Sequence, residues 1–269
     1  MEGPIGIFDS GVGGLTVARE VFNILPHEDV VYFGDVGRSP YGGRSKEIIT
    51  RFTQQDVAFL QEHRVKFIIC ACNTASSVAL DEVGRGLPVK MVGVIEPGAR
   101  AAVERTRAGR VGVIGTAATI NSDAYARTIR ALNPDIKVFS VACPLFVPLA
   151  EEGYIDKEAT LLIARDYLQT MRDVGVDTLI LGCTHYPLLK HVIAGVMGPR
   201  VALIDSGEET ARAARTLLHE EGILKCGDAC TAGAVSYYVS DVPEKFTQVA
   251  ARFLGTVLDR VTRVDISRY

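Results

Sequence analysis

The sequence predicts an α/β protein made of two pseudo-symmetric α/β domains with largely parallel sheets, which face each other across a cleft. Three observations predict this fold. Short apolar runs rich in β-branched residues alternate with longer amphipathic stretches, as in strand–helix units. The strand candidates are almost continuously apolar, which is typical of parallel sheets covered on both faces. Finally, motifs of the first half recur in the second half.

Each expected element follows from its hydrophobic period. We expect strands at Ile5–Phe8, Val30–Phe33, Phe67–Ala71, Val89–Val94, Val111–Ile114, Lys137–Ala142, Thr178–Leu181 and Val201–Ile204. We expect helices at Leu15–Leu25, Lys46–Arg64, Ile95–Arg105, Asp123–Leu132, Lys157–Val174 and Glu208–Glu220. Because helices separate successive strands, the strands are expected to run parallel.

An internal repeat divides the chain into two related units. IGIFDS at Ile5–Ser10 resembles VGVIGT at Val111–Thr116, and IICACNTAS at Ile68–Ser76 resembles LILGCTHYP at Leu179–Pro187. Short apolar strands resemble one another by chance, but the second pair also aligns two cysteines. This match favours a duplication. The second unit is complete by residue 206, which leaves the remaining chain free to return to the first domain.

Composition and charge exclude several classes of protein. Of the 269 residues, 48% are hydrophobic and 23% are charged, so the chain can bury a large core. The net charge is −3 and no extended Lys/Arg cluster occurs, so we expect no nucleic-acid partner. No apolar run reaches about 18 residues, so we expect no membrane span. The N-terminal MEGPIGIFDSG lacks the pattern of a secretory signal, so we expect a cytoplasmic protein with reduced thiols.

The first candidate site residue is Cys72, in ACNTAS at Ala71–Ser76. It ends an apolar strand, where open α/β sheets bind their ligands. Asn73 and Thr74 follow, and they supply amide and hydroxyl groups at a helix start. A lone cysteine is more often a buried structural residue. The polar residues directly after the strand favour a functional site here.

The second candidate is Cys183, in GCTHYP at Gly182–Pro187. It also ends an apolar strand, and Thr184 and His185 follow it. One interpretation is a thiol hydrolase in which His185 activates Cys183, but this leaves Cys72 without a role.

Two cysteines at equivalent positions of facing domains indicate proton transfer instead. Reaction at both faces of one tetrahedral carbon needs a thiolate on one side and a thiol on the other. A free thiol with a pKa of about 8.5 is only about 3% ionised at pH 7, so neighbouring groups must assist. Asp9 and His185 are the candidates.

The cysteine spacing does not predict a metal site. Structural zinc sites use two pairs of closely spaced ligands, and no such pattern is complete in this chain. We therefore expect no metal. Of the other cysteines, we expect Cys70 and Cys143 to be packed in the core. We expect Cys226 and Cys230 to be surface or tail thiols.

Two glycine-containing loops could bind an anionic group. DSGVGG at Asp9–Gly14 opens a helix, so its backbone amides and the helix dipole favour a carboxylate. It is not a dinucleotide fingerprint, because Thr16 occupies the third glycine position, and no P-loop occurs. SPYGGRS at Ser39–Ser45 offers Tyr41 and Gly42, although it could equally be a plain turn.

Together these segments resemble the glutamate racemase family, within the cofactor-independent aspartate/glutamate racemase superfamily. The resemblance rests on motifs spread over about nine-tenths of the chain, in family order: FDSGVGGLTV, GDVGRSPYGGRS, CNTAS, GVIGTAATINSDAY, CPLFVPLAEEG, LGCTHYPLL and YYVSDVPEKF. It implies reversible interconversion of L- and D-glutamate without pyridoxal phosphate, metal or other cofactor. It also implies a cytoplasmic homodimer that supplies D-glutamate for peptidoglycan.

The resemblance assigns catalytic roles to five residues. Cys183 as thiolate would take the α-proton of L-glutamate and Cys72 as thiol would protonate the opposite face, with the roles reversed for D-glutamate. His185 would assist Cys183, and Asp9 would act on the Cys72 side. Glu151, like Asp35, matches a polar family position, although an acid in a loop is often only a solvated side chain or a cap.

The resemblance also implies substrate contacts and domain limits. The expected substrate-binding residues are Asp9, Ser10, Tyr41, Gly42, Asn73, Thr74, Thr119, Thr184 and His185. Their amides and hydroxyls could satisfy two carboxylates without an arginine cluster. The family's C-terminal segment returns to the first domain, so we expect residues 1–97 with 207–269 in one domain and 98–206 in the other, with the active site in the cleft between them.

Three alternatives stay open at the level of sequence. The first is a racemase of aspartate or a related acid, because pocket length cannot be read from sequence. The others are the Cys183–His185 hydrolase and a non-catalytic glutamate-binding protein, and neither explains the paired thiols. The segment KCGDACTAG at Lys225–Gly233 matches no family motif.

Overall fold

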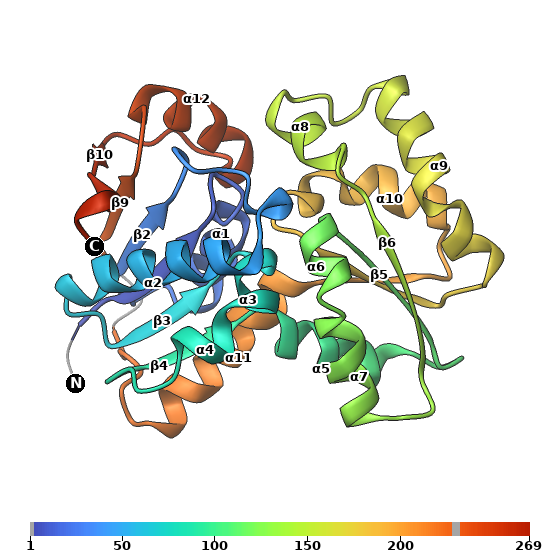
Figure 1. The fold of residues 1–269 in the computed structure, drawn as a ribbon, viewed down its shortest axis with the longest axis horizontal. Coiled ribbons are helices and arrows are strands. Elements are labelled where there is room, and N and C mark those ends of the chain that lie inside the picture. The colour runs from blue at the N-terminus through green and yellow to red at the C-terminus, as the bar shows by residue number, and fades with distance from the viewer. Residues whose placement is uncertain (1–2, 228–231) are drawn as a thin grey trace.

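The computed structural model describes residues 3–227 and 232–269, and within them the strands form two parallel sheets (Figure 1). The first sheet has the order β10-β9-β2-β1-β3-β4, with β1 Ile5–Asp9, β2 Val30–Gly34, β3 Phe67–Cys70, β4 Lys90–Gly93, β9 Val235–Val239 and β10 Val261–Arg263. The second has the order β6-β5-β7-β8, with β5 Arg110–Gly115, β6 Lys137–Ala142, β7 Thr178–Gly182 and β8 Ala202–Asp205. The expected fold class is confirmed.

Helices separate the strands as the sequence predicts. The longer helices are α1 Leu15–Ile24, α2 Lys46–Glu62, α5 Ile95–Arg105, α7 Ala124–Leu132, α9 Glu158–Asp173, α11 Ser206–Glu220 and α12 Pro243–Leu254. The shorter ones are α3 Asn73–Val78, α4 Leu80–Val83, α6 Ala117–Asn121, α8 Phe146–Glu151 and α10 Lys190–Met197, with 3₁₀ turns η1 Tyr41–Gly43, η2 Tyr186–Leu189 and η3 Ile266–Arg268. Every expected strand and helix is present, with ends shifted by no more than two residues.

The two sheets repeat one topology. The order β2-β1-β3-β4 in the first sheet corresponds to β6-β5-β7-β8 in the second, and all pairings are parallel. Strand β3 is therefore equivalent to β7, so Cys72 and Cys183 follow equivalent strands. The duplication expected from the cysteine match is present in the fold.

The two halves exchange their last helices. Helix α5 follows β4 of the first sheet but packs against α7, β7 and β8 of the second. Helix α11 follows β8 but packs chiefly against α1 and α5, and Figure 1 shows α11 on the side of the first sheet and α5 beside α7 of the second. One apolar core runs through this layer, from Ile7 and Val17 across Ala211 to Val113 and Ile180. Apolar burial thus joins the halves on one side of the molecule.

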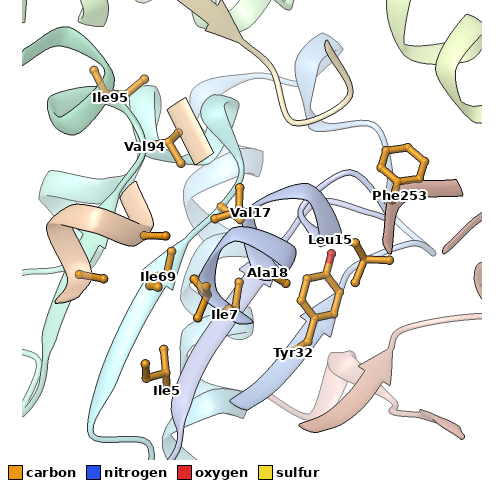
Figure 2. Close-up of a cluster of buried hydrophobic side chains, with 14 of the residues drawn as sticks. Ile5, Ile7, Leu15, Val17, Ala18, Tyr32, Ile69, Val94, Ile95 and Phe253 are labelled. Atoms are coloured by element: carbon orange, nitrogen blue, oxygen red, sulfur yellow. The ribbon is translucent and has the colours of Figure 1, made fainter. Parts of the chain in front are cut away.

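Strand β1 lies at the centre of the first core. All five of its residues are buried, as expected for a strand covered by helices on both faces. Figure 2 shows Ile5 and Ile7 of β1 in one cluster with Ile69 of β3 and with Leu15 and Ala18 of α1. This packing fixes the carboxyl end of β1, where Asp9 stands.

The C-terminal segment returns to the first sheet, where β9 pairs with β2. A buried ion pair anchors the chain that leads there. Lys66 Nζ lies 2.7 Å from Glu28 Oε2 and donates to the Ile223 carbonyl at 2.7 Å, while Glu28 Oε1 accepts from the Lys225 amide. The side chains of Lys66 and Glu28 are only 4% and 1% exposed. Both charges are therefore removed from water and depend on each other.

We expect Lys66→Met to lower the free energy of unfolding by about 3–5 kcal/mol, because it leaves Glu28 buried without its counter-charge. Urea unfolding measures this. The double variant Glu28→Met/Lys66→Met should lose less, since it leaves no unpaired charge. The exposed pair Lys225–Asp29 is the control, and Lys225→Met should cost less than about 1 kcal/mol. Equal losses for Lys66→Met and Lys225→Met would contradict the role given to the buried pair.

Candidate active site

Loops that follow strands of the two sheets meet at one place. The loop after β1 contacts the segment after β7, because a Cβ on Gly13 would lie 2.3 Å from Thr184 Oγ1 and 2.5 Å from His185 Nδ1. Only glycine permits this approach. Thr16 adds a hydrogen bond from its hydroxyl to the Thr184 carbonyl, at 2.8 Å. The first half is thus held directly against the residues that follow Cys183.

Cys72 is the N-cap residue of α3. Its Sγ accepts a hydrogen bond from the Ala75 amide at 3.4 Å and donates to Ser10 Oγ at 3.4 Å. The residue is 4% exposed. Burial, together with the nearby charge of Asp9, raises the pKa of Cys72 to about 12. The thiol is therefore protonated at neutral pH and can act as an acid.

Asp9 ends β1 and is 1% exposed. Its Oδ2 accepts from the Gly11 amide at 2.9 Å, and its Oδ1 has no hydrogen-bond partner among the described residues. Burial raises the pKa of Asp9, against the charge of His185 and the backbone amides of the glycine loop, which lower it. One oxygen of a buried carboxyl group thus remains available for a proton or a cationic group.

Cys183 belongs to a chain of three side chains. His185 Nδ1 lies 3.8 Å from Cys183 Sγ, and His185 Nε2 lies 2.9 Å from Glu151 Oε1 at the end of α8. Burial alone would lower the pKa of His185, but its hydrogen bonds to Cys183 and Glu151 and their charges raise it to about 10. The Phe253 ring stands edge-on to the imidazole, with centroids 5.3 Å apart. His185 is therefore an imidazolium at neutral pH.

The two thiols consequently stand in opposite electrostatic surroundings. A carboxyl group lies near Cys72, and a protonated imidazole lies beside Cys183. An imidazolium in contact with a sulfur can stabilise the negative charge that forms when a thiol gives up its proton. The pair can therefore supply one acid and one base in the same enzyme state, as proton transfer at two faces of a carbon requires.

Hydroxyl and amide groups surround the thiols. Thr74 Oγ1 lies 3.0 Å from Thr116 Oγ1 and 3.4 Å from Thr119 Oγ1, and the latter two are 3.0 Å apart. This cluster links α3 of the first half to α6 of the second. Asn73 Oδ1 accepts from the Tyr125 hydroxyl at 2.7 Å, whereas its buried Nδ2 has no partner in the part of the chain that the structure describes. An unmade buried hydrogen bond is costly, so this amide is available to donate to a bound ligand.

Thr116 is a residue that the sequence reasoning missed. It caps α6, where its hydroxyl accepts from the Thr119 amide. A threonine that directly follows an apolar strand and precedes a helix was the available signal. The same reasoning selected Thr119 alone from this loop.

Tyr41 and Gly42 lie beside this cluster, but the Tyr41 hydroxyl is not directed at the threonines. The Tyr41 hydroxyl is hydrogen-bonded to Asp35 Oδ2 and Asp56 Oδ2, so a contact with substrate would have to use the Tyr41 backbone. A Cβ on Gly42 would lie 2.8 Å from Thr116 Cβ, so its backbone lies directly against the threonines. Asp35 contacts Tyr41 and Arg38, and no hydrogen bond links it to either thiol in the described residues.

A cleft of about 590 Å³ opens beside the site. Its walls come from both halves and include Gly11, Ser39 and Phe246 from one side and Val147 and Glu151 from the other. Glu151 joins the cleft to His185, whereas Cys72 and Cys183 are only 4% and 6% exposed.

The other thiols stand apart from this site. Cys70 and Cys143 are fully buried, as expected, and Cys226 is exposed. Cys230 lies outside the described residues. Across residues 3–227 and 232–269, no group of three or more His, Cys, Asp and Glu side chains is arranged to hold a metal ion. In the same residues no helix combines the length and the apolar character that crossing a membrane demands.

The chain belongs to the Asp/Glu/Hydantoin racemase family, whose model matches residues 23–214. A glutamate racemase from Geobacter metallireducens is 52% identical over 262 residues, which are 97% of this chain and 96% of that protein. A solved glutamate racemase isoform from Bacillus anthracis has a TM-score of 0.93 and 39% identity, over 98% of both chains. The Francisella tularensis glutamate racemase, solved in complex with D-glutamate, has a TM-score of 0.92 and 40% identity, over 99% of this chain and 98% of that chain.

The charge on His185 makes stability depend on pH. Its pKa is about 10 in the folded protein and about 6.5 in an unfolded chain, so the folded state binds the proton more tightly. This contribution is fully present below about pH 6.5 and is lost as the pH rises through about 10. We expect the loss of unfolding free energy in Glu151→Gln to be larger at about pH 6 than at about pH 10.

Urea unfolding at both pH values measures this difference. Glu152→Gln is the matched control, because Glu152 is the next residue and is exposed. It should change stability little at either pH. A loss in Glu151→Gln that does not vary with pH would contradict the charged His185–Glu151 pair.

Proposed function

We propose that this racemase interconverts L- and D-glutamate by proton transfer through Cys72 and Cys183. The observation that carries the proposal is the pair of buried thiols at equivalent strand ends, one beside a carboxyl group and one beside an imidazolium. The names of the relatives support glutamate as the substrate. Because two side chains supply the acid and the base, the reaction as proposed needs no cofactor.

In the L-to-D direction, the Cys183 thiolate takes the α-proton of L-glutamate. The C–H bond breaks, an S–H bond forms, and the electron pair stays on the substrate carbon and its carboxylate. The Cys72 thiol then gives its proton to the opposite face, which leaves Cys72 as thiolate and Cys183 as thiol. That state is the one required for the reverse reaction with D-glutamate. His185, held by Glu151, stabilises the negative charge on Cys183 whenever that residue is a thiolate.

The unpartnered polar atoms indicate how substrate is held. Asn73 Nδ2 and the threonine hydroxyls are donors that suit a carboxylate, and Asp9 Oδ1 suits the ammonium group or a transferred proton. We propose that Ser10, Thr184 and the backbone around Gly42 complete these contacts. The full set is the one expected from sequence: Asp9, Ser10, Tyr41, Gly42, Asn73, Thr74, Thr119, Thr184 and His185.

Opening of the cleft fits the expected domain limits. We propose that residues 1–97 with 207–269 move against residues 98–206. The limits fall near the first turns of α5 and α11, the two exchanged helices. The resemblance to glutamate racemases also supports a cytoplasmic homodimer that supplies D-glutamate for peptidoglycan.

The test is exchange of the α-proton with solvent deuterium, followed separately for L- and D-glutamate. We expect Cys72→Ser and Cys183→Ser each to lower racemisation at least about a hundredfold, because each removes one acid–base group. Aspartate, run in parallel, should exchange more slowly than glutamate. Cys226→Ser is the control and should match the wild type, since that thiol is exposed and remote from the site's contacts.

Two results would contradict the proposal, and a third would invalidate the probe. Normal racemisation in either active-site variant would exclude the two-thiol mechanism. Faster exchange of aspartate would change the substrate. Loss of activity in Cys226→Ser would show that serine replacement is not a specific probe.

A further inference from the structure

A buried polar cluster lies near the active site, and among the described residues no hydrogen bond links it to either thiol. We call Arg38, Asp35, Asp56 and Tyr41 the Arg38 cluster. Arg38 Nε donates to Asp35 Oδ2 at 2.6 Å and Arg38 Nη2 donates to Asp56 Oδ1 at 3.0 Å. The Tyr41 hydroxyl joins the same two carboxyl groups, at 2.5 Å from Asp35 and 3.0 Å from Asp56. Both aspartates are fully buried.

The charges in the Arg38 cluster do not cancel if both carboxyl groups are ionised. One guanidinium faces two buried carboxylates, and an uncompensated charge away from water is costly. Burial raises the pKa of Asp56 well above its usual value; the charge of Asp35 adds to this effect and that of Arg38 opposes it. If Asp56 is protonated, the cluster holds one carboxylate and one guanidinium. The carboxyl O–H of Asp56 can then donate to the Tyr41 oxygen, and the Tyr41 hydroxyl donates to the Asp35 carboxyl group.

The Arg38 cluster contacts the start and the middle of a short segment that reaches the site. Arg38 precedes Ser39–Gly43 and Tyr41 lies within it. At one end of the segment, Ser39 Oγ lies where a Cβ on Gly11 would come within 3.0 Å. At the other end, the Gly42 backbone lies against Thr116, and η1 packs against α3 and α6. The segment thus spans the glycine loop and the threonine cluster.

We propose that the Arg38 cluster positions Ser39–Gly43 for substrate binding, with Arg38 and Asp56 acting as positioning residues that do not touch the substrate. This inference rests on the proposed function for its kinetic part. The segment offers backbone groups to a substrate carboxylate. This contact is made in both the ground state and the transition state. Displacing the segment therefore weakens binding in both states, so it raises KM and leaves kcat nearly unchanged.

Two variants remove parts of the Arg38 cluster while keeping the segment's backbone. Tyr41→Phe deletes only the bridging hydroxyl, and Arg38→Met deletes the guanidinium. We expect each to raise KM about tenfold for both enantiomers, with kcat within about twofold of the wild type. Arg51→Met is the matched control, because Arg38 and Arg51 both lie over the Phe52 ring, at 4.0 Å and 5.7 Å, and only Arg38 belongs to the cluster. It should leave KM unchanged.

Asp56→Asn and Asp56→Leu test the proton assigned to Asp56. Asparagine retains a donor and an acceptor, so Asp56→Asn should keep KM within about twofold, whereas Asp56→Leu should behave like Tyr41→Phe. A tenfold rise in Asp56→Asn equal to that in Asp56→Leu would contradict a protonated Asp56.

Amide hydrogen exchange of the Ser39–Arg44 peptide gives a readout that does not depend on racemisation. It should be several-fold faster in Tyr41→Phe and Arg38→Met than in the wild type and in Arg51→Met. Failure of the wild type to racemise glutamate would reject the proposed function and leave this result standing. Unchanged exchange, or a fall in kcat with KM unchanged, would reject the positioning role.

Discussion

The ion pair between the buried His185 imidazolium and the partly exposed Glu151 is the interaction on which the site depends. Two identical thiols in identical surroundings would share one protonation state, and neither acid nor base chemistry could begin. The protein separates them by placing a cation beside Cys183 and a carboxyl group near Cys72. In the proposed mechanism, charge placement around equivalent sulfurs gives the two thiols of a symmetric scaffold distinct roles.

The duplicated fold supplies the symmetric part of this arrangement. Equivalent strands β3 and β7 are each followed by a cysteine, Cys72 after β3 and Cys183 directly after β7. Exchange of α5 and α11 joins the halves by a common apolar core on one side and leaves a cleft on the other. The asymmetric part comes from single contacts, such as the glycine at position 13 that lets the first half approach His185.

Local sequence patterns predicted the strands, the two thiols and His185, because a strand period and the residue at a strand's end are local properties. Local patterns do not predict which residues that are distant in the sequence pack together. Nothing in the period of α5 or α11 indicates that each covers the opposite sheet, since both helices simply carry an apolar face. The hydroxyl of Tyr41 turns toward Asp56, which comes from a different helix, and Thr116 joins the threonine cluster only through contact between the halves.

The ultraviolet absorbance of the thiolate tests the asymmetric charge most directly. Difference spectra at neutral pH compare the wild type with Cys183→Ser and with Cys72→Ser. The charge arrangement described here predicts that thiolate absorbance is unchanged in Cys72→Ser, because burial and the nearby charge of Asp9 raise the pKa of Cys72 to about 12. A loss of thiolate absorbance in Cys72→Ser would contradict it.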